Sequence, residues 1–179
     1  VLAVATSASR RATNAKEFYR QVQKETGLNF TIISGQQEAL YSFLGARSGM
    51  PMTQETAISS MDLGGGSTEV VFGDGHGIQW STSLELGSAR LTEDFLRPGG
   101  AGIEAMQAHI EREIQAVPQR FPIQTIVAMA GTATTLGAID LGLTEWKPEL
   151  VHGHWLSRET LQCIASRLEE STPTQRRRM

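Results

Sequence analysis

Apolar and polar residues along the chain follow two different periods. Short apolar runs of the kind that form β-strands lie at residues 1–6, 29–34, 57–63, 68–74, 78–86 and 125–130. Between them, apolar residues recur every three or four positions, which predicts helices over residues 14–26, 34–49, 88–96, 103–117, 132–141 and 157–170. Because strands alternate with helices, the pattern favours an α/β fold with a mixed sheet.

Local signals mark several ends of these elements. Ser34 and Gln37, three residues apart, form a capping-box pattern at the start of one helix, and Gly27 is suited to close the helix before it. The sequence DGHG at residues 74–77 predicts a hairpin turn between two strands. Glycine and proline interrupt a polar run at residues 48–56, which is therefore the best candidate for a linker.

Composition narrows the classes of function. The 179 residues carry a formal net charge of −3, which gives no general electrostatic reason to bind nucleic acid. No window offers the roughly eighteen uninterrupted apolar residues of a membrane span. The one cysteine, Cys163, excludes an intrachain disulfide, and its place beside Leu161 and Ile164 predicts a buried thiol. We therefore expect a cytoplasmic protein with no nucleic-acid or membrane partner. Because the chain begins inside an apolar run, we also expect it to be a fragment.

The stretch MDLGGGSTEV carries the strongest chemical signal. Gly64, Gly65 and Gly66 follow a strand, and glycine both adopts positive φ and lets a ligand approach the backbone N–H groups. These glycines predict an anion cradle suited to phosphate. Asp62 at the strand end would act through a bridging Mg²⁺ or an attacking water, and we expect a similar role for Glu69. The alternative is a tight hairpin between two strands that binds nothing.

Other segments add weaker signals. TSASRR places Arg10 after a strand, where its guanidinium can hold a phosphate, and SGQQEA places Glu38 in the first turn of a helix. Arg10 could instead be solvated, and Glu38 could serve only as a partner of the helix dipole. The small-residue turn at 131–135 could accept a phosphate or a base, or be a closely packed crossover. His152 and His154 lack a third ligand in the sequence, so we interpret them as loop or packing residues.

Six segments, in order along the chain, resemble the exopolyphosphatase and guanosine pentaphosphate phosphohydrolase (Ppx/GppA) family. They are AVATSASR, IISGQQEA, SMDLGGGSTEVVFG, LELGSARLTEDFL, AGTATTLGA and VHGHWLSRETL. The resemblance implies the actin-like ATPase (RNase H-like) α/β fold, in which two such domains enclose a phosphate-binding cleft. On this interpretation residues 1–47 end the first domain, residues 48–56 are the linker, and residues 57–179 form most of the second domain.

The resemblance also implies roles for individual residues. Arg10 matches an arginine that grips phosphate, and Glu38 matches the proposed general base, with Gln37 in place of the glutamate that precedes it in the family. Asp62 and Glu69 match acids associated with the metal and the nucleophilic water, Asp62 being the expected Mg²⁺ ligand. The second phosphate loop of the family is matched by Gly64, Gly65, Gly66 and Ser67.

For the full-length protein, the resemblance implies a Mg²⁺-dependent enzyme that hydrolyses terminal phosphoanhydride bonds of inorganic polyphosphate, guanosine pentaphosphate or both. The first phosphate loop of the family, a D-x-G-S-N-S-type segment, has no counterpart in this sequence, so we expect the chain by itself to be nearly inactive. Two alternatives remain, an actin-like-fold sugar or acetate-type kinase and a non-catalytic module that binds guanosine polyphosphate. The sequence does not separate the two substrates, and it leaves the oligomeric state open, a homodimer being one option.

Overall fold

The computed structural model describes residues 2–51, 53–121, 125–176 and 179. Two compact units divide the chain, Val1–Ala128 and Met129–Met179. This division lies far from the linker expected at 48–56, and the expected domain boundary there stays a prediction. The first unit contains every residue that we selected from the MDLGGGSTEV, TSASRR and SGQQEA segments.

The first unit begins with two short parallel strands. β1 (Ala3–Ala5) pairs with β2 (Phe30–Ile32), so that Ala3 lies opposite Phe30. Between them lie α1 (Ser7–Arg11), which we did not predict, and α2 (Ala15–Thr26), which confirms the helix expected at 14–26. The Tyr19 ring of α2 stacks on the Phe30 ring with centroids 5.0 Å apart. This aromatic contact holds α2 against the strand pair.

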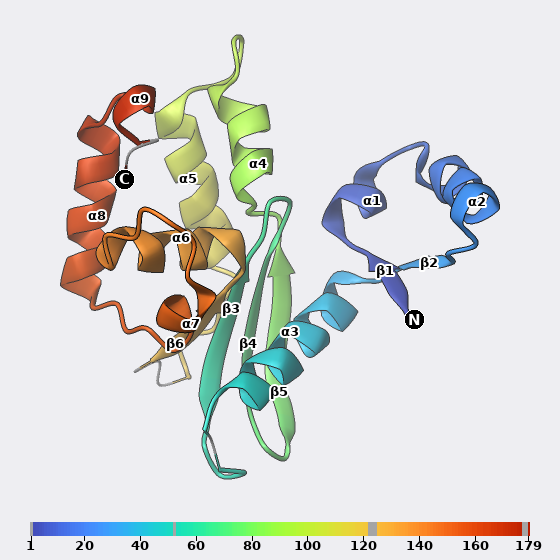
Figure 1. Ribbon diagram of the computed structural model, residues 1–179, viewed down its shortest axis with the longest axis horizontal. Coiled ribbons are helices and arrows are strands. Elements are labelled where there is room, and N and C mark those ends of the chain that lie inside the picture. The colour runs from blue at the N-terminus through green and yellow to red at the C-terminus, as the bar shows by residue number, and fades with distance from the viewer. Residues whose placement is uncertain (1, 52, 122–124, 177–178) are drawn as a thin grey trace. The chain divides into compact units, whose positions relative to one another are not determined.

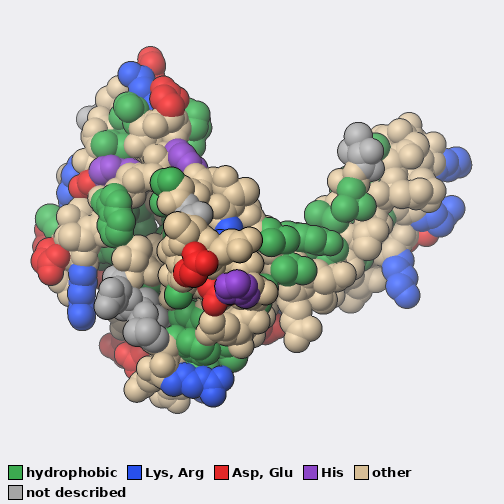
Figure 2. All heavy atoms as spheres, turned by 90° about the horizontal axis from the view of Figure 1, so that it is seen from below, with side chains coloured by type: hydrophobic (Ala, Val, Ile, Leu, Met, Phe, Trp, Pro, Cys, Tyr) green, Lys and Arg blue, Asp and Glu red, His purple; other side chains and the backbone are tan. Residues whose placement is uncertain are grey.

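Helix α3 (Gly35–Gly49) begins with the predicted capping box. The Ser34 hydroxyl accepts from the Gln37 backbone N–H, and the Gln37 side chain accepts from the Ser34 backbone N–H. Its buried face packs against the next sheet (Figure 1), and the residues of that face are Ala39, Phe43 and Ala46. Hydrophobic side chains also remain at the molecular surface (Figure 2), and those of α3 are Leu40, Tyr41 and Leu44.

The main sheet has four strands in the order β5-β4-β3-β6. β3 (Ile58–Leu63), β4 (Thr68–Asp74) and β5 (Gly77–Leu84) form an antiparallel meander that confirms three of the predicted strands. The Asp74 carboxylate caps the predicted turn by accepting from the backbone N–H groups of His76 and Gly77. A β-bulge at Phe72/Gly73 shifts the β4–β5 register by one residue.

The remaining elements are mostly helical. In the first unit α4 (Ser88–Leu91) continues as the π-helix η1 (Thr92–Leu96), which confirms the helix expected at 88–96. α5 (Ile103–Ile114) follows, and β6 (Ile126–Met129), whose last residue belongs to the second unit, is the outer strand beside β3. In the second unit α6 (Ala130–Asp140) and α8 (Arg158–Glu170) were predicted, whereas the four-residue helices α7 (Pro148–Val151) and α9 (Pro173–Arg176) were not.

Two expectations about the second unit can be compared with the structure. His154 Nε2 lies 2.7 Å from the Asp140 carboxylate, so this histidine joins the segment after α7 to the end of α6. The prediction of a buried thiol is wrong, because Cys163 is exposed. Ile164 is the buried residue of α8, and one helical step of about 100° turns its neighbour Cys163 towards solvent. No helix in the described part of the chain is long and apolar enough to cross a membrane.

Candidate active site

The glycine-rich loop joins β3 to β4, and backbone hydrogen bonds from the start of α4 fix its carbonyl groups. The Gly64 N–H donates to the Ser67 carbonyl oxygen over 3.1 Å, which closes the loop. Backbone N–H groups of Ser88 and Arg90, at the start of α4, donate to the carbonyl oxygens of Gly64 and Gly65 over 3.1 and 3.0 Å. Within the described residues no acceptor is found for the backbone N–H groups of Gly65, Gly66 and Ser67. The loop therefore presents unpaired donors, as an anion site requires.

The need for glycine in this loop differs from our expectation. We expected positive φ, but Gly64, Gly65 and Gly66 are not among the residues with positive φ. At Gly66 close packing is the reason instead, because a β-carbon there would lie 2.7 Å from the Ser7 hydroxyl oxygen. Ser7 is itself buried, so it cannot easily move aside. The backbone of the loop thus lies directly against the start of α1.

Asp62 and Glu69 lie opposite each other on β3 and β4, and their side chains therefore share one face of the sheet. Glu69 is only 1% exposed. Burial raises the pKa of its carboxyl group, hydrogen bonds from the hydroxyls of Ser83 and Ser67 oppose that rise, and the nearby carboxylates of Glu38 and Asp62 add to it. Three acids therefore meet at this point of the first unit.

Glu38 reaches this cluster from helix α3 and is paired with Arg10. Arg10 Nη1 donates to Glu38 Oε2 over 2.7 Å and to the Ile33 carbonyl oxygen over 3.0 Å. Both side chains are largely shielded, at 25% and 16% exposed. Arg10 is thus held by two protein acceptors rather than solvated, and Glu38 does more than face the helix dipole.

The structure brings together Arg10, Glu38, Asp62, Glu69 and the loop from Gly64 to Ser67. It also shows two contacts that sequence reasoning missed. The Ser42 hydroxyl donates to Asp62 Oδ2, and the Ser83 hydroxyl donates to Glu69 Oε1 over 2.6 Å. Ser42 could have been found from its i+4 spacing to Glu38 on α3. The turn at 131–135 belongs to the second unit, and its expected role stays a prediction.

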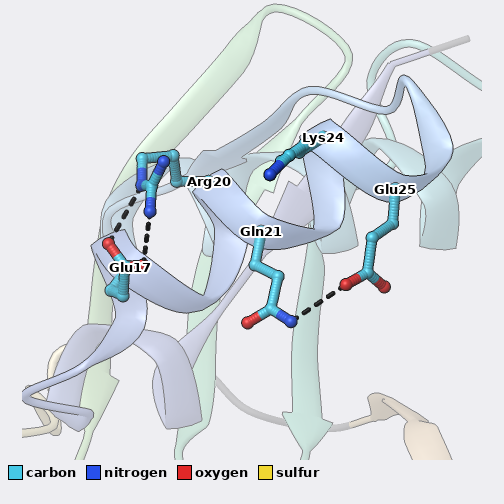
Figure 3. A pocket seen from close by; sticks show the side chains of 5 residues that line it. All are labelled: Glu17, Arg20, Gln21, Lys24 and Glu25. Carbon is cyan, nitrogen blue, oxygen red and sulfur yellow. Dashed lines mark hydrogen bonds and ion pairs between the residues drawn. The ribbon is translucent and has the colours of Figure 1, made fainter.

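A surface pocket on α2 is separate from this cluster of site residues (Figure 3). One face of this single helix lines it, with Glu17, Arg20, Gln21, Lys24 and Glu25. Four of these side chains form two pairs, Glu17 with Arg20 and Gln21 with Glu25. None of the predicted site residues lines this pocket, so we do not place the active site there.

The donors present suit a hard cation bound together with a substrate. Among the described residues, no group of three or more His, Cys, Asp or Glu side chains could enclose a metal ion. Mg²⁺ at phosphoryl-transfer sites usually needs only one or two carboxylates and completes its shell with waters and substrate phosphates. Asp62 and Glu69 supply such a pair. A cation there would offset the carboxylate repulsion that helps to raise the pKa of Glu69. The residues therefore fit Mg²⁺.

Comparison with known proteins defines the class to which this fold and site belong. The chain matches the Ppx/GppA phosphatase family over residues 1–178, and it is a member of that family. Among curated relatives, exopolyphosphatase 2 of Mycobacterium tuberculosis is 30% identical over 185 residues, covering 97% of this chain and 57% of the relative. Exopolyphosphatase 1 of Mycobacterium leprae is 32% identical over 117 residues, covering 64% of this chain and 34% of the relative.

Solved structures agree with this assignment. The Ppx/GppA enzyme of Aquifex aeolicus superposes with a TM-score of 0.80 at 34% identity, covering 98% of this chain and 58% of that one. An exopolyphosphatase from Cytophaga hutchinsonii superposes with a TM-score of 0.81 at 26% identity, covering 98% and 59%. The predicted α/β fold is confirmed, and it is the fold of these Ppx/GppA and exopolyphosphatase structures. The chain spans a little over half the length of these two structures.

Proposed function

We propose that the full-length protein hydrolyses the terminal phosphoanhydride bond of inorganic polyphosphate or guanosine pentaphosphate and releases phosphate. One observation carries the proposal, namely that three carboxylates and a paired arginine meet beside a loop with unpaired backbone donors. Membership of the Ppx/GppA phosphatase family supports the reaction class. A cytoplasmic location is part of the same proposal.

The loop and Arg10 bind the terminal phosphate in this mechanism. Backbone N–H groups of Gly65, Gly66 and Ser67 donate to its non-bridging oxygens, where negative charge increases in the transition state. Arg10 uses one nitrogen for Glu38 and Ile33, and its other N–H donors remain for the phosphate. Binding by these donors places the phosphorus for attack by a water in line with the leaving oxygen.

Glu38 is the general base. Its Oε2 is held by Arg10, which fixes the carboxylate while Oε1 accepts a proton from the attacking water. Asp62 and Glu69 would hold Mg²⁺ together with phosphate oxygens, and the metal would neutralise charge on the transferred phosphoryl group. Burial of Glu69 and the hydroxyl donors around it fix the direction of its carboxylate. Water therefore attacks between a base on α3 and an acid pair on the sheet.

Phosphate release by the full-length protein tests this proposal. Polyphosphate, guanosine pentaphosphate, and ATP with glucose are supplied separately, so that hydrolysis, a preference between substrates, and kinase activity give different results. Glu38→Gln is expected to lower kcat by about 10²- to 10⁴-fold while the Kd for polyphosphate changes little, because the amide keeps its size but accepts no proton.

Glu17→Gln is the matched control, since Glu17 is an exposed acid on α2 that pairs with Arg20. Wild-type turnover by Glu38→Gln would remove the general base from the mechanism. Tight binding of guanosine pentaphosphate with no phosphate release by the wild-type protein would support a non-catalytic module instead.

A further inference from the structure

Helix α3 is connected to all three acids of the site, although it carries only one of them. Glu38 lies in its first turn. Ser42, one turn further along the same face, donates its hydroxyl proton to Asp62 of β3. The helix therefore both supplies the proposed base and holds the acid opposite Glu69.

The third acid is connected through the start of the helix. Ser83 of β5 donates to Glu69 Oε1 over 2.6 Å, and Ser83 lies directly opposite Glu69 across β4 and β5. The backbone of Gly35 packs on the same serine, since a β-carbon at Gly35 would lie 2.5 Å from Ser83 Cβ. A shift of α3 along the sheet would consequently disturb the Ser83 contact as well as the Ser42 contact.

The two hydroxyls hold carboxylates that have no cationic partner within the described residues. Arg10 pairs with Glu38, but no Lys, Arg or His in the described part of the chain forms an ion pair with Asp62 or Glu69. A neutral donor fixes the direction of a carboxylate without neutralising its charge. Such a donor leaves the charge available for a cation or for the substrate complex.

We propose that Ser42 and Ser83 are positioning residues through which helix α3 aligns Asp62 and Glu69 with Glu38. This proposal rests on the proposed function, because the alignment of the three acids matters for catalysis only if they carry out the proposed hydrolysis. Neither serine touches the substrate. Each acts through the carboxylate that it holds, and the close contact between Gly35 and Ser83 makes the alignment depend on the place of the helix.

The experiment compares Ser42→Ala and Ser83→Ala in the full-length protein with matched serine controls. Ser48→Ala removes a hydroxyl of α3 that donates to the Gly45 carbonyl oxygen, and Ser81→Ala changes the same face of β5 two residues away. Each protein is assayed for kcat and KM on polyphosphate, for Mn²⁺ affinity by electron paramagnetic resonance titration, and for its unfolding midpoint.

The two test variants are expected to lose about 10- to 100-fold in kcat or in Mn²⁺ affinity, the usual cost of removing a residue that orients a metal-site carboxylate. KM should change much less, because the phosphate-binding loop is untouched. Ser42→Thr keeps the hydroxyl and should restore most of the loss. Asp62→Asn should cost less in the Ser42→Ala protein than in the wild type, since the two residues act as a unit.

Gly35→Ala keeps the test decisive if Ser83→Ala folds poorly. Alanine suits a helix better than glycine, so a purely local effect would stabilise the protein. The contact with Ser83 predicts instead a loss of kcat, with Mn²⁺ affinity reduced in parallel.

Separate outcomes decide the two proposals. Test variants that stay within about twofold of the Ser48→Ala and Ser81→Ala controls in both kcat and Mn²⁺ affinity overturn the positioning role. A wild-type protein that releases no phosphate, but whose Mn²⁺ affinity falls in Ser42→Ala, overturns the proposed function and leaves the positioning role standing.

Discussion

Arg10 Nη1 donates to two acceptors at once, Glu38 Oε2 over 2.7 Å and the Ile33 carbonyl oxygen over 3.0 Å. One end of the guanidinium group thereby ties α1 to the end of β2 and the first turn of α3. Three N–H donors of the same side chain remain for a phosphate. Lysine has a single ammonium group and cannot hold a carboxylate, a carbonyl and a phosphate in this fixed fork.

Arg10→Lys is therefore expected to raise the KM for polyphosphate by about 10- to 100-fold, the equivalent of one lost hydrogen bond to a charged group. Steady-state phosphate release by the full-length protein measures the effect. Arg20→Lys is the control, because Arg20 is 70% exposed on α2. A KM unchanged by Arg10→Lys would mean that Arg10 only supports Glu38.

Asp62→Asn should increase the Mg²⁺ concentration needed for half-maximal phosphate release. The change removes a negative charge from the proposed metal side of the site while keeping an oxygen that can accept from Ser42. We expect an increase of at least about tenfold, the lower end of the cost of perturbing a metal-site carboxylate. Asp74→Asn, in the hairpin turn, serves as the control. Identical Mg²⁺ curves for wild type and Asp62→Asn would contradict the assignment.

Glu69→Gln should make the protein more stable at neutral pH while it lowers activity. The pKa of Glu69 is raised in the folded state, chiefly by burial, so folding is favoured when the group is protonated. That contribution is complete below the unfolded pKa, near the ordinary value of 4.5, and is lost as pH rises through the folded pKa. Glutamine stays neutral at every pH, so the variant does not lose this stability as the pH rises.

Thermal unfolding at pH 8 and at pH 4.5 tests the predicted direction of this pH-dependent change in stability. Glu69→Gln should have the higher midpoint at pH 8, and the difference should shrink as the pH falls. Glu104→Gln, at an exposed position in the first turn of α5, should show no such pH-dependent difference. A lower midpoint for Glu69→Gln at pH 8 would show that the buried carboxylate is stabilised by contacts that outweigh its desolvation.

Gly66→Ala and Gly65→Ala should differ in effect although the residues are neighbours. An added β-carbon at Gly66 meets the buried Ser7, whereas one at Gly65 lies 3.7 Å from Ala89 Cβ, an ordinary contact. We expect Gly66→Ala to cost about 1–3 kcal/mol of unfolding free energy through overpacking and to raise KM. Gly65→Ala should change the stability little. Equal unfolding midpoints for the two variants would contradict the packing argument.

Much of the fold could be predicted because local signals and the tertiary structure agree. The capping box at Ser34 and Gln37 formed as expected, and the hairpin turn at 74–77 was placed correctly. The short helices α1 and α7 were missed, because four or five residues are too few for a periodic pattern. Cys163 was misplaced for a related reason, since a stripe with few apolar residues leaves the buried face of α8 ambiguous.

The site could be predicted only as far as its motifs reach. Glu38, Asp62 and Glu69 stand out by residue type and place. Of the two hydroxyl donors, Ser42 can be found from its spacing to Glu38 on α3, whereas Ser83 cannot. A regular hairpin register continued from Asp74 and Gly77 would place Thr82 opposite Glu69, whereas the bulge places Ser83 there. Gly73, an isolated glycine inside β4, is a signal for a bulge, but it does not fix the register beyond it, so the donor to Glu69 could not be predicted.

The bulge at Phe72/Gly73 also limits which insertions and deletions the hairpin loop at residues 74–77 can accept. Loops at hairpin tips ordinarily accept insertions and deletions, since their backbone is exposed. Here a one-residue change at residues 74–77 that slid β5 past β4 would turn Ser83 to the other face and bring a different side chain to Glu69. Functional variants with a longer or shorter loop should therefore change only the exposed loop and keep the β4–β5 register unchanged. This holds although the loop itself contacts none of the three acids.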